Sequence, residues 1–201
     1  LARDRVFVSA VGDISATDLG QILDLLLGDL PETGAAKPGD ANPAFAGGVH
    51  VTQFDTPQSV VSFGQGGIHR DDPDFFPAFV LMQVLGGSGF SSRLMTEVRE
   101  KRGLTYGIAA YLADRDLSQS IMGRVSTVNA RVAETIEVIR EEWRKVAEEG
   151  ITAEELDRAQ TYLTGAYPLR FDGNGRIANI LVGMQLDGLG IDYIATRNDK
   201  V

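Results

Sequence analysis

Apolar residues recur at helical spacing in four stretches of the chain. After Ser15, leucines and isoleucines occupy the i, i+3, i+4 and i+7 positions as far as Leu30, which predicts an amphipathic helix with Ser15 as its N-cap. Residues 75–85 are apolar on most sides, which is typical of a buried helix. A long helix is expected from Asn129, its cap, to Gly150, and a Thr-x-x-Glu capping box opens another over residues 152–169.

Alternation of apolar and polar residues predicts five strands, which are residues 5–11, 49–54, 59–65, 105–112 and 117–127. Two shorter helices are expected at residues 91–102, closed by Gly103, and at 176–188. Strands and helices come in blocks rather than in strict alternation. The chain is therefore predicted to be α+β, with an antiparallel or mixed sheet covered on one face by helices.

Residues 31–47 carry three prolines and several small residues, which is typical of a linker. This segment separates residues 1–30 from a domain expected over residues 48–201. The first residue is Leu1 rather than methionine, and the chain ends just after an apolar stretch. We therefore expect a truncated piece of a longer protein.

Composition excludes several kinds of partner. The formal net charge of −9 argues against nucleic acid, because phosphate binding needs clustered cations. No apolar run is long enough to cross a bilayer, so membrane insertion is not expected. The absence of cysteine excludes disulfides and thiolate zinc sites.

Metal and nucleophile chemistry find little support in the residues present. The two histidines, His50 and His69, lie 19 positions apart, and neither HExxH nor HxxEH occurs. There is no GxSxG elbow, and the glycine clusters do not continue into phosphate-binding loops. We expect no metal ligand and no catalytic residue in this piece.

Residues 86–106, GGSGFSSRLMTEVREKRGLTY, combine a glycine-rich loop, a cationic helix and the start of a strand. Arg99 and Tyr106 are seven residues apart across the expected helix-to-strand turn, a spacing at which a guanidinium and a phenol can converge on one backbone carbonyl. Glycine at positions 86, 87 and 89 would let another main chain approach closely. The alternative is structural: cations in a last helical turn offset the helix dipole, and Tyr106 covers the sheet.

The run LGGSGFSSRLMTEVREKRGLTYG resembles the second half of pitrilysin/insulinase-type zinc peptidases, the group that includes mitochondrial processing peptidase. The similarity extends to VSAVGDIS near the start of the chain, to the run from Phe54 to Gly87, and to GITAEEL after Glu149. Essentially the whole chain is covered.

The resemblance implies a metallopeptidase LuxS/processing-peptidase-like fold, in which two α+β halves form a clamshell around a peptide. One half binds zinc through HxxEH, and the other supplies an Arg/Tyr pair that holds the substrate backbone. This chain is similar to the zinc-less half of a two-domain clamshell subunit. The resemblance makes residues 1–30 the end of a preceding homologous domain. The substrate-binding residues that it implies are Arg99, Tyr106, Gly86, Gly87, Ser88 and Gly89.

The same resemblance implies a peptide substrate and an HxxEH-bearing homologous subunit or domain as partner, with zinc on that partner half. A separate inactive subunit of a heterodimer, without hydrolytic activity alone, is expected. The alternative function is a purely structural interaction subunit with no role in proteolysis; a third is a fragment that dimerises through its exposed sheet. Bacterial relatives are often exported, so a periplasmic location is expected, with the cytoplasm as the alternative.

Overall fold

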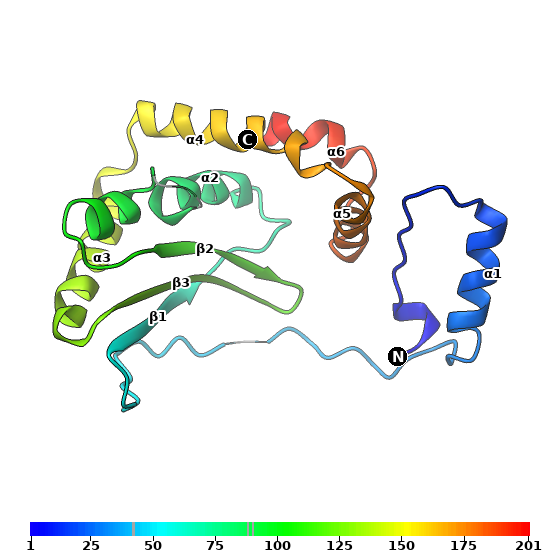
Figure 1. Ribbon diagram of the computed structural model, residues 1–201, viewed down its shortest axis with the longest axis horizontal. Coiled ribbons are helices and arrows are strands. Elements are labelled where there is room, and N and C mark those ends of the chain that lie inside the picture. The colour runs from blue at the N-terminus through cyan, green and yellow to red at the C-terminus, as the bar shows by residue number, and fades with distance from the viewer. Residues whose placement is uncertain (42, 88, 90) are drawn as a thin grey trace. The chain divides into compact units, whose positions relative to one another are not determined.

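The backbone forms two units, seen in the computed structural model, which describes residues 1–41, 43–87, 89 and 91–201 (Figure 1). The first unit comprises Leu1–Gly39 and Thr164–Lys200, and the second comprises Asp40–Leu163 with Val201. The limits of residues 1–30, 31–47 and 48–201 expected from the sequence stay a prediction.

The first unit is helical. Its elements are the 3-10 turn η1 (Arg3–Arg5), α1 (Ala16–Leu27), η4 (Pro168–Arg170), α5 (Asn174–Leu186), α6 (Tyr193–Thr196) and η5 (Arg197–Lys200). Ser15 caps α1 as predicted, because its Oγ accepts the Asp18 N–H at 3.1 Å. The helix ends at Leu27 rather than at Leu30, and none of its residues is buried.

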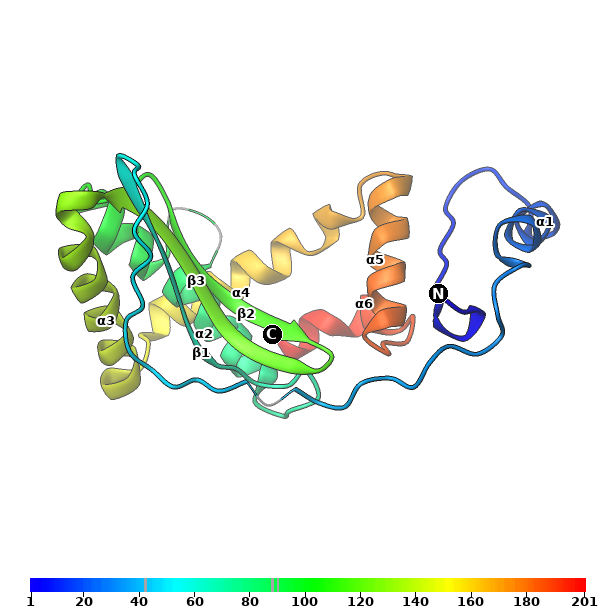
Figure 2. The same ribbon diagram turned by 90° about the horizontal axis from the view of Figure 1, so that it is seen from below.

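The second unit contains a three-stranded antiparallel sheet in the order β1-β3-β2. The strands are β1 (Gln58–Gly66), β2 (Ile108–Arg115) and β3 (Ser118–Val128). Its helices are α2 (Phe75–Gly86), the π-helical segment η2 (Met95–Glu100), η3 (Asn129–Arg131), α3 (Val132–Glu149) and α4 (Ala153–Ala166), of which the last three residues belong to the first unit. Helices α2 and α4 lie on the same side of the sheet (Figure 1), and the view from below looks onto the opposite face (Figure 2). The predicted α+β architecture is confirmed.

The main core lies between the sheet, α2, η2 and α3. Leu94 and Val98 are completely buried there beside Val125 of β3. Phe63 and Trp143 meet edge to face at 5.7 Å at the margin of this core. A second cluster, which contains Val80, Val84, Ala159 and Leu163, joins α2 to α4.

Two predicted strands do not form. In residues 5–11 a 3-10 turn is followed by unpaired extended chain, and residues 49–54 are also unpaired and mostly exposed. Val51 and Phe54 are 85% and 80% exposed. Alternation favours a strand, but a strand also needs a neighbour for its backbone hydrogen bonds, and the described residues supply none here.

Two predicted boundaries also need correction. Strand β2 begins at Ile108 rather than at Thr105. Asn129 does not cap α3, which begins at Val132 after η3. The Asn129 amide instead donates to the Thr56 carbonyl at 2.8 Å and accepts from Ser59 Oγ at 2.8 Å. These contacts use Asn129 to tie the start of β1 to the end of β3.

Gly86→Ala is expected to destabilise the protein. A Cβ at this position would lie 2.6 Å from the Ala110 Cβ and 2.7 Å from its nitrogen, because the end of α2 packs directly on β2. We expect a loss of about 2 kcal/mol in the free energy of unfolding, measured by chemical denaturation. Gly165→Ala is the matched control: a Cβ there has no neighbour within 4 Å, and the helix should gain about 0.5 kcal/mol. Equal stability of the two variants would contradict this packing argument.

Candidate functional site

The segment that carries Arg99 is a π-helix rather than the α-helix expected over residues 91–102. Ser92 Oγ accepts the Met95 N–H at 3.4 Å near its start. The Lys101 N–H then bonds to the Thr96 carbonyl five residues back, at 2.9 Å. One extra residue per turn changes the direction in which the following side chains point, and such widened turns are frequent at functional sites.

Gly103 closes this segment in the left-handed conformation, with φ at +61°. Its N–H bonds to the Arg99 carbonyl, and the Leu104 N–H bonds to the Val98 carbonyl, both at 2.9 Å. Each bond spans one residue more than in the usual glycine-terminated α-helix, which matches the widened π turn. The predicted role of Gly103 is confirmed.

Two threonines fix the chain between η2 and β2. Thr127 Oγ1 donates to the Leu104 carbonyl at 2.6 Å, and Thr105 Oγ1 donates to the Ser126 carbonyl at 2.7 Å. The Thr105 hydroxyl also accepts the Gly107 N–H at 3.1 Å. Tyr106 follows these anchors and precedes Ile108, where β2 begins to pair with β3, and it is 92% exposed. The backbone on both sides is therefore held, while the phenol is available to a ligand.

The other cations of the motif form ion pairs. Arg93 makes a bidentate pair with Glu155, at 2.6 and 2.7 Å, and also donates to the Gly150 carbonyl at 3.1 Å. Lys101 Nζ and Arg102 Nη1 each lie 2.6 Å from a Glu97 oxygen. These pairs favour a structural role for Arg93, Lys101 and Arg102, as in the alternative interpretation of the motif.

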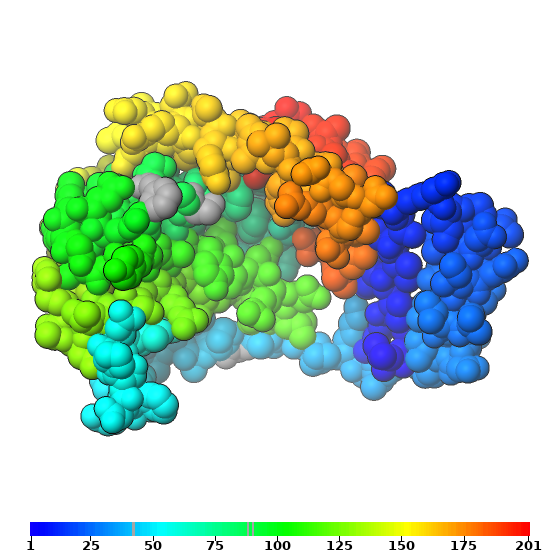
Figure 3. Space-filling model, in the orientation of Figure 1, coloured from blue at the N-terminus to red at the C-terminus, as the bar shows by residue number. Residues whose placement is uncertain are grey.

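Arg99 lies within η2 and is partly exposed, and Figure 3 shows the green segment after α2 at the surface of the molecule. The structure therefore places Arg99 and Tyr106 on the two sides of the Gly103 turn. Their convergence on one substrate carbonyl stays a prediction.

The glycines before η2 differ in their surroundings. Gly86 is buried against β2, and a Cβ on Gly87 would lie 2.7 Å from the Gln83 Cα. Gly89 is exposed, has φ at +107°, and has open space around it. Ser88 lies outside the described residues. Packing explains glycine at positions 86 and 87, whereas Gly89 has the open backbone that a close approach requires.

The carboxylates that hold this segment are strongly stabilised in their charged form. The bidentate hydrogen bonds from Arg93 lower the pKa of Glu155 to about 2, with further help from Thr152. Burial alone would raise the pKa of Glu97, but hydrogen bonds from Lys101 and Arg102 lower it below its usual value. Both carboxylates therefore stay ionised at neutral pH.

Glu155→Gln should isolate the contribution of the Arg93 pair, because glutamine can still complete the capping box with Thr152. The pKa of Glu155 falls on folding from 4.5 to about 2, so its stabilisation is full above about pH 4.5 and is lost as the pH falls towards 2. Near neutral pH we expect the variant to lose about 1–2 kcal/mol, a value discounted for solvent screening.

This prediction is checked by denaturation curves of wild type and variant between pH 2 and 8. Glu154→Gln is the control, because the Glu154 side chain is 82% exposed and its nearest arginine nitrogen is 3.9 Å away. A stability difference for Glu155→Gln that stays constant down to pH 2 would contradict the argument.

The described residues, which are 1–41, 43–87, 89 and 91–201, contain no group of three potential metal ligands. His50 lies in the exposed segment before β1, and His69 Nδ1 accepts the Asp71 N–H at 3.1 Å in a polar turn. The same part of the chain contains no helix with the length and apolarity needed to span a membrane.

Comparison with known proteins assigns the family. Residues 1–163 match the family model described as the peptidase M16 inactive domain. An uncharacterized zinc protease of Streptomyces coelicolor is 33% identical in an alignment 189 positions long, which covers 87% of this chain and 39% of that protein. A non-peptidase homolog of Helicobacter pylori is 28% identical over 75% of this chain and 35% of its own length.

Solved structures agree with this assignment. A peptidase M16 inactive domain from Pseudomonas fluorescens superposes with a TM-score of 0.74 at 29% identity, over 94% of this chain and 45% of that one. A protease from Helicobacter pylori gives a TM-score of 0.76 at 16% identity, over 94% of this chain and 47% of that one, and so shares the fold.

The chain belongs to the peptidase M16 family and corresponds to its inactive domain. The resemblance to pitrilysin/insulinase-type zinc peptidases is thereby confirmed. The chain spans less than half the length of these two curated relatives.

Proposed function

We propose that this chain is the substrate-binding, non-catalytic half of a zinc metallopeptidase. In this proposal Arg99 and Tyr106 hold the backbone of a peptide while a zinc site on a partner domain or subunit cleaves it. The observation that carries the proposal is the 92% exposure of Tyr106, whose backbone is anchored to β3 by hydrogen bonds at Leu104 and Thr105 before it and by strand pairing from Ile108 after it. A phenol held in this way has little packing role and is available as a hydrogen-bond donor.

The chemistry of peptide hydrolysis suits this pair. Negative charge develops on the carbonyl oxygen of the tetrahedral intermediate, and fixed donors near it lower the barrier. Arg99 supplies a permanent cation with a planar set of donors, and Tyr106 supplies one hydroxyl. Zinc, when bound by the partner half, supplies the activated water.

A second candidate function is a non-catalytic interaction subunit. The Helicobacter pylori relative is named a non-peptidase homolog, which favours this candidate, whereas the Streptomyces relative is named a zinc protease, which favours the first. Sequence similarity to both supports a shared scaffold.

The deciding experiment uses the full-length protein that contains this chain. It is mixed with a homologue that carries HxxEH, zinc and an unstructured fluorogenic peptide, and each protein is also assayed alone. We expect cleavage to need an HxxEH-bearing half together with Arg99 and Tyr106. Cleavage by the HxxEH homologue at the same rate with and without this protein would contradict the proposal.

A periplasmic location is also part of the proposal. It rests on the resemblance to exported bacterial peptidases and is tested by fractionating source cells and probing each fraction for the protein. Recovery with cytoplasmic markers would contradict it.

A further inference from the structure

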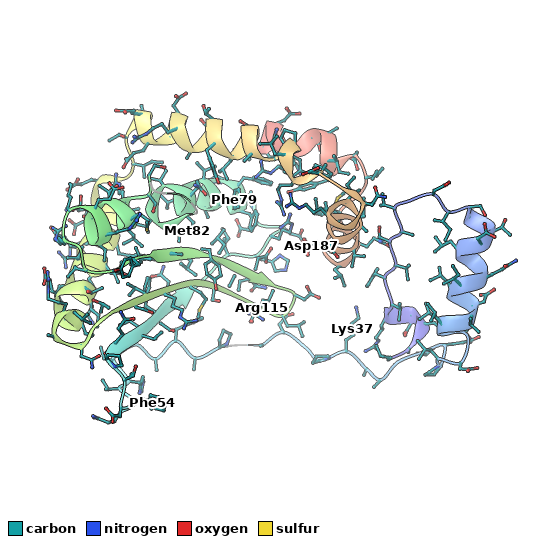
Figure 4. The ribbon with its side chains drawn as sticks, in the orientation of Figure 1. Lys37, Phe54, Phe79, Met82, Arg115 and Asp187 are labelled. Atoms are coloured by element: carbon teal, nitrogen blue, oxygen red, sulfur yellow. The ribbon has the colours of Figure 1, made fainter. Side chains whose placement is uncertain are left out.

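Two buried threonines lie behind the turn of residues 103–107, which carries Tyr106. Thr127 of β3 is 1% exposed, and Thr135 of α3 is completely buried. Thr127 follows Val125 by two residues, so its side chain lies on the same face of the sheet as the core that contains Val125 and Met82, which is labelled in Figure 4. A hydroxyl in such a core is costly unless it is hydrogen-bonded, so each threonine needs a partner inside the protein.

The Thr127 hydroxyl donates its proton to the backbone of the turn. Its Oγ1 lies 2.6 Å from the Leu104 carbonyl oxygen, which can only accept. Thr135 Oγ1 lies 2.9 Å from the carbonyl of Arg131, four residues earlier in the chain, and 3.4 Å from Thr127 Oγ1. The shorter contact is the stronger one, so Thr135 bonds mainly to its own helical segment. Thr127, by contrast, ties the central strand to the turn.

Leu104 joins the segment that carries Arg99 to the sheet. Its N–H bonds to the Val98 carbonyl of η2 at 2.9 Å, its carbonyl accepts from Thr127, and its side chain is 4% exposed. Arg99 follows Val98 directly, and Tyr106 comes two residues after Leu104. Without the Thr127 hydroxyl the Leu104 carbonyl would lose its buried partner, and the turn would shift relative to η2.

The sheet register leaves this part of the chain outside the backbone ladder. Pairing of β2 with β3 begins at Ile108 and Val125, and its continuation towards the turn would set Tyr106 opposite Thr127. The ladder stops before that pair, while Thr127 is paired on its other side with Ser59 of β1. The Thr127 hydroxyl therefore takes the place of a ladder bond and holds the chain two residues before Tyr106.

We infer that Thr127 is a positioning residue, which keeps Arg99 and Tyr106 in one fixed relative placement. The inference rests on the proposed function, because it takes these two side chains to hold a peptide backbone. Thr127 is buried and acts through the Leu104 carbonyl rather than by contact with the peptide. Two donors that share one oxygen tolerate little displacement, since a misplacement of about 1 Å costs up to about 10²-fold in rate.

Thr127→Val and Thr127→Ser separate positioning from stability. Valine keeps the volume and removes the donor, whereas serine keeps the donor and removes a buried methyl group. In the full-length protein, assayed with its HxxEH-bearing half, we expect Thr127→Val to lower kcat about tenfold and to change KM far less. Thr127→Ser should keep kcat within about twofold of wild type although its melting temperature falls.

Thr135→Val is the matched control, because it removes a buried hydroxyl of the same region that bonds mainly to the Arg131 carbonyl. It should lower the melting temperature to a similar extent as Thr127→Val and keep kcat within about twofold of wild type. Equal losses of kcat in the two valine variants, or in Thr127→Val and Thr127→Ser, would mean that these changes act through stability alone. Either result, or a normal kcat for Thr127→Val, would overturn the inference.

Hydrogen exchange of the turn gives a readout that needs no peptidase activity. The Leu104 N–H is protected by its bond to the Val98 carbonyl. We expect Thr127→Val to speed exchange of this amide about tenfold, and Thr127→Ser and Thr135→Val to leave it near the wild-type rate. The same exchange rate in wild type and Thr127→Val would show that the hydroxyl does not fix the turn.

The outcome is separable from that of the proposed function. If Tyr106→Phe lowers turnover but Thr127→Val does not, the proposed function holds and the positioning role of Thr127 is wrong. If Arg99→Ala and Tyr106→Phe both leave turnover unchanged, the proposed function is wrong, while faster exchange in Thr127→Val still upholds the placement of the turn by Thr127.

Discussion

Arg99→Ala is expected to lower peptide turnover about 10²–10³-fold when the full-length protein is assayed with its HxxEH-bearing half. The reason is that Arg99 is proposed to donate to the oxygen that becomes negative in the transition state, where a lost donor is most costly. The ground-state peptide carries less charge there, so kcat should fall far more than KM rises. Steady-state kinetics with a single unstructured peptide measures both.

Two further variants make this prediction specific. Lys101→Ala removes a cation two residues away whose side chain is paired with Glu97, and turnover should stay within about threefold of wild type. Tyr106→Phe removes only one hydroxyl and should lower turnover by the same order as Arg99→Ala. The double variant should cost less than the product of the two losses, because the donors share one oxygen. Normal turnover by Arg99→Ala would rule out the proposed role.

Local signals in the sequence predicted the helices well. Ser15 caps α1, and Thr152 with Glu155 forms the expected capping box at the start of α4. Such caps are made by residues three positions apart, so short sequence windows contain all the information they need. The π-helical form of η2 was missed, because the extra residue in its turn depends on packing of Leu94 and Val98 in the core.

Strands were predicted less well for a different reason. Residues 59–65 and 49–54 have similar alternation, but only the first pairs with β3. A strand depends on a partner that is distant in sequence, and alternation indicates which face is apolar without naming that partner. Val49 and Val51 are 62% and 85% exposed. The apolar residues of this segment thus alternate as in a strand, but they pack against no sheet.

The candidate site shows the same division. Arg99, Gly103 and Tyr106 could be proposed from the sequence because they lie in one continuous motif, whereas the pairing of Arg93 with Glu155 joins positions 62 residues apart.

Leu94→Ala is expected to cost about 3 kcal/mol in the free energy of unfolding of the full-length protein. Leu94 is completely buried where η2 begins, next to the Arg93–Glu155 pair, and its loss would leave a cavity between η2 and the sheet. Leu169→Ala is the control, because Leu169 is 73% exposed and should cost less than about 0.5 kcal/mol. Urea denaturation followed by circular dichroism measures both. Because Leu94 is completely buried and cannot contact the peptide, turnover of folded Leu94→Ala should exceed that of Arg99→Ala at low temperature. Equal stability of the two leucine variants would mean that the core does not anchor η2, and the fixed placement of Arg99 would lose its physical basis.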